Sequence, residues 1–251
     1  ALLSTVVNNS GLIQARTVNN QSGTIILEGG TANIGGTLDA SAPNGGNGGF
    51  IETSGASVNM AAGLRVTTKA AQGTTGTWLI DPTNYTIGTG VTGTNYWKNT
   101  DLQTALNGSN IVVQTDNASG SDAGDINVLA PVSWSANTLT LSAYRNVNIN
   151  AVLTATGTSS LAMTSGTGGS GSIDYGLTAS GFPGKVNFDR SGSGFLTING
   201  SGYSVISNLT ELQALQLGNS SVKYYIGADL NANATAFTPI GSGSGNAFKG
   251  V

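Results

Sequence analysis

Short runs of β-branched and aliphatic residues recur along this chain at a nearly constant spacing, with no helix-length segment between them. Asp125–Val128 (DINV) recurs about 21 residues later as Asn146–Ile149 (NVNI), and Leu129–Val132 (LAPV) recurs at the same spacing as Asn150–Leu153 (NAVL). Adjacent parallel strands normally need a crossover of a dozen or more residues, which is usually a helix. Because this period leaves no room for a helix, it predicts an all-β chain that winds as a right-handed parallel β-helix, a solenoid.

Two further matches support the repeat. Thr138–Ala143 (TLTLSA) returns about 22 residues later as Ser160–Ser165 (SLAMTS). Upstream, Gly23–Gly29 (GTIILEG) and Gly48–Gly55 (GGFIETSG) lie about 25 residues apart, and the Gly-rich insert Pro43–Gly49 accounts for the longer spacing. At about 21 residues a turn, the chain would form about twelve turns and a rod of roughly 55 to 60 Å.

Alternation within the runs indicates strands with one buried face. Val147 and Ile149 point to one side, while Asn146, Asn148 and Asn150 point to the other. Only 8% of the residues are charged, as stacked strands require, because like charges would repel across neighbouring turns. An antiparallel sandwich is the alternative fold, but it would need hairpin turn signals between most strands.

Two segments have helical spacing instead. Thr100–Leu106 (TDLQTAL) has Thr100 as its candidate N-cap. Asn208–Leu215 (NLTELQAL) has Asn208 as its cap and Glu211 in a capping-box position. We therefore expect two short helical excursions from the solenoid.

A strand follows each of these helices, at Ile111–Gln114 and at Val222–Ile226. The helix-then-strand unit marks a soft boundary after Asn199. The expected domains are residues 1–199, which form the coils, and residues 200–251, a helix-strand unit that leads into a Gly-rich repeat.

Composition excludes several functions. The chain has no Cys and no His, so catalytic triads, conventional zinc sites and a disulfide framework are ruled out. Its net charge is −3, and Lys and Arg are not clustered, so nucleic acid is not an expected partner. No run approaches the roughly 20 apolar residues of a membrane span. We expect no cofactor.

Several motifs together resemble a known family, the high-molecular-weight and filamentous-haemagglutinin-like adhesins of Gram-negative bacteria, which are exported by two-partner secretion. The first group is Gly48–Gly55 (GGFIETSG), Leu64–Thr67 (LRVT) and Trp78–Ile87 (WLIDPTNYTI). The second is Asp125–Trp134 (DINVLAPVSW), Leu139–Ser142 and Val147–Thr154 (VNINAVLT). Near the end of the chain, Tyr225–Leu230 (YIGADL), Phe237–Gly241 (FTPIG) and Phe248–Val251 (FKGV) resemble the start of a Gly-rich repeat of bacterial surface proteins.

The resemblance implies a secreted or cell-surface adhesin that attaches to host cells, other bacteria or surfaces. Its partners would be a host or bacterial surface receptor, including glycans, and an outer-membrane transporter during export. The Asn-Pro motifs of the family's secretion domain are absent, so the chain is expected to be an internal passenger segment. Two other functions stay open: a β-helical carbohydrate-active enzyme, and the stalk of a toxin-delivery protein. We expect no enzymatic activity.

Acidic residues supply two candidate sites. Asp116, Asp122 and Asp125 lie within ten residues and could gather oxygen ligands for Ca²⁺, although their spacing matches no known calcium loop. Glu28 and Glu52 occur in the two matched runs GTIILEG and GGFIETSG and could stack on neighbouring turns. A glycosidase would need such a carboxyl pair, but a charged ladder on the flank of the rod is the simpler interpretation.

Aromatic and glycosylation signals complete the candidate sites. Trp78 and Trp134 stand beside apolar runs and are expected in the core, whereas Trp97, with Tyr96, stands in a polar context and is the candidate ligand surface. Nine Asn residues begin an Asn-X-Ser/Thr acceptor, about as many as this composition gives by chance. They are Asn8, Asn20, Asn84, Asn107, Asn117, Asn199, Asn208, Asn219 and Asn233.

Overall fold

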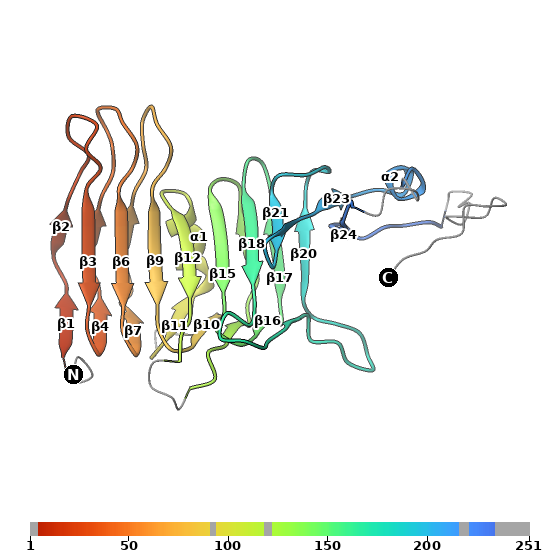
Figure 1. Cartoon of the computed structure of the whole chain (residues 1–251), viewed down its shortest axis with the longest axis horizontal. Helices are drawn as coiled ribbons and strands as arrows, with labels where there is room; N and C mark the ends of the chain where they lie inside the picture. Colours follow the sequence, from red (N-terminus) through yellow and green to blue (C-terminus); the bar gives the residue numbers. More distant parts are fainter. Residues whose placement is uncertain (1–4, 91–93, 118–121, 216–220, 234–251) are drawn as a thin grey trace.

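A computed structural model describes residues 5–90, 94–117, 122–215 and 221–233. The protein is all-β, as the sequence predicts: strands dominate, and the described residues contain two short helices (Figure 1). No helix in this described part of the chain is long and apolar enough to cross a membrane.

One long sheet runs through most of the molecule. It has eight strands in the order β22-β21-β18-β15-β12-β9-β6-β3. Their bounds are β3 Thr24–Glu28, β6 Phe50–Ser54, β9 Thr77–Asp81, β12 Asn110–Gln114, β15 Thr138–Ser142, β18 Ser160–Thr164, β21 Leu196–Ile198 and β22 Ser201–Gly202.

Four shorter sheets accompany the long one. The first two have the orders β1-β4-β7 and β11-β10-β13-β16-β19, with β1 Val6–Asn9, β4 Thr31–Ile34, β7 Ser57–Met60, β10 Tyr85–Gly88, β11 Tyr96–Lys98, β13 Ile126–Val128, β16 Val147–Ile149 and β19 Ile173–Asp174. The other two have the orders β2-β5-β8 and β14-β17-β20, with β2 Leu12–Gln14, β5 Thr37–Asp39, β8 Arg65–Thr67, β14 Val132–Trp134, β17 Val152–Ala155 and β20 Lys185–Phe188. A separate pair joins β23 Ser204–Ile206 to β24 Tyr224–Ile226.

The strands succeed one another in a regular order. After β3, β6, β12, β15 and β18, the chain forms one strand in each of two shorter sheets before it returns to the long sheet. Apart from β21 with β22, every strand pair in the described part of the chain is parallel. The antiparallel alternative is therefore wrong for these sheets.

Strand register confirms the repeats seen in the second half of the sequence. Ile126 pairs with Val147, and Val132 pairs with Leu153. Thr138 pairs with Ser160 in the long sheet. These pairings connect the same runs, DINV with NVNI and TLTLSA with SLAMTS, that the sequence matches.

A constant period near 21 residues is wrong for the whole chain. Stacked residues lie 21 apart at Asn127 and Asn148, but 26 apart at Asn33 and Asn59. Gln114 lies 33 residues from its neighbour Asp81, because a helix is inserted between their strands. With eight strands in the long sheet, the expected count of about twelve turns is also too high.

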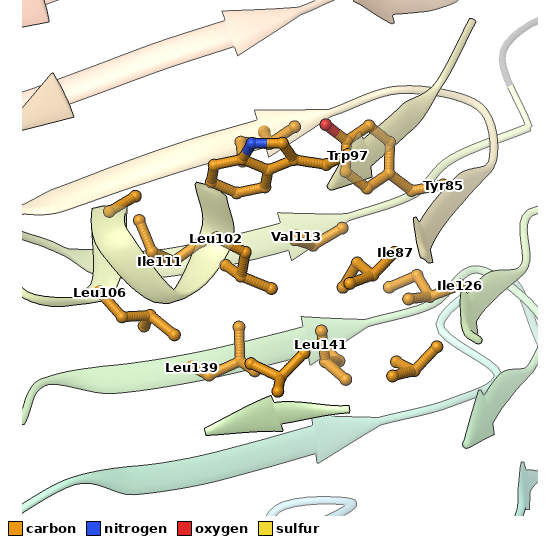
Figure 2. Packing of buried hydrophobic residues seen from close by; sticks show 14 of the residues in the cluster. Tyr85, Ile87, Trp97, Leu102, Leu106, Ile111, Val113, Ile126, Leu139 and Leu141 are labelled. Carbon is orange, nitrogen blue, oxygen red and sulfur yellow. The ribbon is translucent and has the colours of Figure 1, made fainter. Parts of the chain in front are cut away.

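The core is built from stacked inward-facing side chains. One row of the long sheet consists of Ile25, Ile51, Trp78, Ile111, Leu139, Leu161 and Leu196, and each of these residues is at most 4% exposed. Burying one large apolar side chain contributes roughly 1.5 to 3 kcal/mol. Figure 2 shows Trp97, Leu102 and Leu106 in this core, near Ile111 and Val113.

The first helix, α1, spans Asn99–Leu106 and buries Leu102, Ala105 and Leu106. The predicted cap is wrong: the N-cap position is Lys98, which makes no capping bond, and Thr100 lies inside the first turn. Tertiary packing of the apolar face compensates for the missing cap.

The second helix, α2, spans Leu209–Gln213 and ends earlier than the sequence predicts. Its predicted cap is confirmed, because the Asn208 side chain accepts a hydrogen bond from the Glu211 amide at 2.9 Å. The Glu211 carboxylate accepts in turn from the Ser207 amide, one residue before the position that a capping box uses.

Candidate functional site

The predicted aromatic surface is not exposed. Trp97 is 2% exposed, and its ring lies 5.1 Å from that of Trp78 in an edge-to-face arrangement. Trp97 pairs with the inward-facing Ile87 in β10, so the pleat turns its ring into the core. Trp97 as an exposed surface residue is therefore a wrong prediction. Tyr96 is half-buried, and its hydroxyl accepts a hydrogen bond from the Gly90 amide at 2.7 Å.

Two of the three aspartates proposed for Ca²⁺, Asp122 and Asp125, bind different partners. Asp122 accepts a hydrogen bond from the Thr83 hydroxyl at 2.6 Å. Asp125 forms a two-point ion pair with Arg145, at 2.8 and 2.6 Å, and this bond lowers the pKa of Asp125. Within the described residues, no three acidic side chains are placed to hold a metal ion. The calcium candidate is therefore not assembled here.

The possible stacking of Glu28 on Glu52, as a carboxyl pair or as a charged ladder, is wrong. Glu28 pairs with Ser54 and Glu52 with Ile26, because these strands pair residues that lie 26 apart, whereas the two glutamates lie 24 apart. The two glutamates therefore occupy different rows of the outer face of the long sheet, and they form no ladder.

Asp81 is an acidic residue that sequence reasoning missed. Burial, the negative charge of Asp116 and that of Glu52 raise its pKa to about 6, against an opposing hydrogen bond from Gln114. That bond, 3.2 Å long, reaches one carboxylate oxygen, while the other has no partner among the described residues. In the sequence, Asp81 stands directly between the apolar run Trp78–Ile80 and Pro82, and this position was a signal of its burial. The approach of Glu52 and Asp116 could not be predicted in this way, because it depends on the register of the strands.

Four of the candidate glycosylation residues make side-chain hydrogen bonds within the fold. Asn84 accepts hydrogen bonds from the Gly124 and Asp125 amides. Asn199 accepts from the Ser165 amide. Asn208 caps α2, and Asn8 accepts from the Asn33 side chain at 2.8 Å.

The other acceptor residues have different positions. Asn20, Asn107 and Asn233 are exposed, and Asn117 is half-buried. Asn219 lies outside the described residues, as do the Ser or Thr of the acceptors that begin at Asn117 and Asn233.

Polar side chains form hydrogen-bonded ladders along the outside of the sheets. The Asn59 amide nitrogen donates to Asn33 at 2.8 Å, and Asn33 donates to Asn8 at the same distance. Asn148 donates to Asn127 at 2.9 Å in another sheet. The first ladder lines a groove of about 480 Å³, together with apolar residues such as Ile34 and Met60.

A second groove, of about 450 Å³, lies between α1 and the strands β14 and β17. Its lining is almost entirely neutral and polar: Thr100, Gln103, Thr104, Asn107, Ser133, Trp134, Ser135 and Thr156. Neither groove includes Asp81, Glu52 or Asp116. Both grooves are therefore lined mainly by neutral polar groups, whereas Asp81 and Glu52 lie on strands of the long sheet, apart from the grooves.

No family model, no curated protein and no solved structure matches this chain.

Proposed function

We propose that this chain is a structural and binding segment of a large secreted or cell-surface bacterial adhesin, built as a right-handed parallel β-helix. One observation carries the proposal: like polar residues repeat on the outer faces of successive parallel strands, as in the ladder of Asn8, Asn33 and Asn59. Such a ladder arises when each turn of chain lies on the one before it.

Strand order supports the β-helix. The chain visits the long sheet and then one strand in each of two other sheets before it returns, and the returning strand pairs parallel to the previous one. Connections of this kind between parallel strands are right-handed in nearly all proteins. Each turn then adds about 4.8 Å to a rod.

The chemistry of the outer surface supports a binding role. Only 8% of the residues are charged, and both grooves present carboxamides and hydroxyls. Such groups form hydrogen bonds with the hydroxyls of glycans without needing an ionic partner. A host or bacterial surface receptor that carries glycans is therefore the proposed partner.

The proposed membership of the filamentous-haemagglutinin-like adhesins rests on the motifs GGFIETSG, WLIDPTNYTI and DINVLAPVSW. Membership of this family would imply export through an outer-membrane transporter and a location outside the bacterial cell. A fold with nearest-neighbour contacts suits such export, because turns can form one after another as the chain emerges.

A carbohydrate-active enzyme is the second candidate function, and one observation favours it. Asp81, with a pKa of about 6, is influenced by the charges of Asp116 and Glu52, and glycosidases pair a carboxyl of raised pKa with an ionised one. A reducing-sugar assay on bacterial and host polysaccharides separates the two functions. Activity that Asp81→Asn abolishes would support the enzyme.

Attachment is tested with fluorescent beads that carry the purified chain. We expect saturable binding to epithelial or bacterial cells, with competition by the free chain. Beads that carry an unrelated β-rich protein of similar mass and charge are the control. Binding no greater than this control, across host and bacterial cells, would contradict the adhesin proposal.

A further inference from the structure

Helix α1 takes the place of a strand beside β14. β14 is an edge strand of its sheet, yet its edge groups are occupied: the Ser133 amide donates to Gln103 Oε1 at 2.7 Å, and the Pro131 carbonyl accepts from Asn99 Nδ2 at 2.6 Å. A helix covers such an edge without continuing the sheet. The groove of about 450 Å³ lies between the surface of α1 and that of β14.

The groove retains hydrogen-bonding capacity after its internal bonds are counted. Gln103 uses its oxygen for the Ser133 amide, which leaves its NH₂ group to donate. The side chains of Asn107 and Ser135 make no hydrogen bond within the described part of the chain, and both residues are exposed. Donors and acceptors therefore face the groove from the helix and from the strand.

Trp134 supplies a second and independent observation. It is 4% exposed and lines the groove, but its indole Nε1 has no acceptor among the described residues. Buried polar groups in native proteins almost always have a partner, and each one left without a partner is costly. Because the Nε1 atom itself is buried, a ligand oxygen in the groove would supply the missing acceptor only after a small shift of the lining.

We propose that the groove between α1 and β14 binds an uncharged saccharide. The proposal deepens the adhesin function, on which it rests, by naming the ligand class and its site. The volume falls within the range of small-ligand sites, and the lining of carboxamides, hydroxyls and one indole matches a ligand rich in neutral hydroxyls.

Two other ligand classes fit less well. The lining has no Lys or Arg, so an anionic saccharide or a phosphate has no counter-charge there. An extended peptide normally binds by adding to a free strand edge, and Asn99 and Gln103 already occupy that edge of β14.

The test uses calorimetry and tryptophan fluorescence on the whole chain, with cellotriose, maltotriose and N,N′-diacetylchitobiose as neutral probes and a heparin disaccharide as the charged one. Asn107→Asp places a charge in the groove, and Trp134→Phe removes the indole N–H. Asn187→Asp, on β20 outside the groove lining, is the matched control. We expect at least one neutral probe to bind, and both groove variants to bind it about tenfold more weakly or worse, while the control is unchanged.

Three results would overturn the proposal: no neutral probe binds at about 10 mM, only the heparin disaccharide binds, or Asn107→Asp binds as the wild type does.

The same proteins on beads separate this inference from the adhesin proposal. Cell attachment without saccharide binding defeats the saccharide site alone. Saccharide binding without cell attachment defeats the adhesin function and leaves the site in place. Circular dichroism of each variant verifies folding, and Asn107→Asp keeps the test decisive if Trp134→Phe fails to fold.

Discussion

The indole N–H of Trp78 donates a hydrogen bond to the Thr53 hydroxyl, 3.0 Å away, in the interior between neighbouring strands β9 and β6. Both residues are fully buried, and the Trp97 ring lies 5.1 Å from that of Trp78 on the inner side. The bond satisfies a large buried donor at the point where the chain leaves its regular order to form β11 and α1.

Replacing Thr53 with Val keeps the shape of the side chain but removes this acceptor. We expect a loss of about 1 to 3 kcal/mol in the free energy of unfolding, because the indole N–H stays buried without a partner. Urea denaturation measures it. Thr140→Val, at an outward position of β15 whose hydroxyl makes no hydrogen bond within the described residues, is the control and should change stability by less than about 0.5 kcal/mol. Equal effects of the two variants would argue against the importance of the bond.

Glycines that precede three strands of the long sheet stack closely. A Cβ at Gly49 would lie 2.1 Å from the Gly23 carbonyl oxygen, and one at Gly76 would lie 2.0 Å from that of Gly49. These contacts are with backbone, so they can be relieved only if the neighbouring strands move apart. We expect Gly49→Ala to lower the midpoint of thermal unfolding and to cost about 2 to 4 kcal/mol.

The control for this substitution is Gly11→Ala, because a Cβ there meets no atom within 4 Å. Its effect should stay within about 0.5 kcal/mol. If Gly49→Ala unfolds at the temperature of the wild type, the backbones of Gly23 and Gly49 lie farther apart than the structure shows.

Asp81 should make stability depend on pH. Its pKa is raised in the folded chain from 3.8 to about 6, so between these values the folded state binds more protons than the unfolded state. Stability from this group therefore increases as pH falls from about 7 to about 4. Asp81→Asn should stabilise the protein by on the order of 1 to 2 kcal/mol at about pH 7.5, allowing for solvent screening. The gain should vanish near pH 4.

Urea unfolding of the wild type and Asp81→Asn across this pH range checks the prediction. The difference between the two proteins isolates Asp81 from other carboxyls that titrate in the same range. A difference that does not change with pH would mean that Asp81 ionises normally in the folded chain.

The ion pair of Asp125 and Arg145 should make stability depend on pH in the opposite direction to Asp81. The pKa of Asp125 is lowered, chiefly by its hydrogen bond from Arg145, so its stabilisation is present above about pH 4 and is lost as pH falls through the folded pKa. Asp125→Asn should cost about 1 kcal/mol at pH 7. Asp229→Asn, which breaks an exposed pair with Lys185, should cost almost nothing. Denaturation at pH 7 and at about pH 3 tests both variants.

Register was predictable from sequence where the chain has no insertions. The runs Asp125–Val128 and Asn146–Ile149 match in sequence at the same spacing of 21 residues at which their strands pair. In the first half, the Gly-rich segment Pro43–Gly49 lies between the paired strands, and the motif match predicted their register only approximately, so that the suggested stacking of Glu28 on Glu52 is wrong.

The burial of Trp97 and the environment of Asp81 depend on three-dimensional pairing. Trp97 stands among polar neighbours in the sequence, but its pairing with Ile87 turns it inward. Asp81 acquires its raised pKa in part from Asp116 and Glu52, which belong to other segments. The local sequence pattern predicts strands, but it does not specify which residues of neighbouring strands lie beside each other.

Cysteine pairs test the parallel stacking most directly, because the chain has no cysteine of its own. Parallel β15 and β18 place Thr138 beside Ser160, within reach of a disulfide. Thr164 lies four residues farther along β18, which is roughly 13 Å from Ser160 and out of reach of Thr138. We predict that the double variant Thr138→Cys with Ser160→Cys oxidises rapidly to an intramolecular disulfide and that Thr138→Cys with Thr164→Cys stays reduced. An antiparallel arrangement of these strands would reverse the two results, and that reversal would contradict the account.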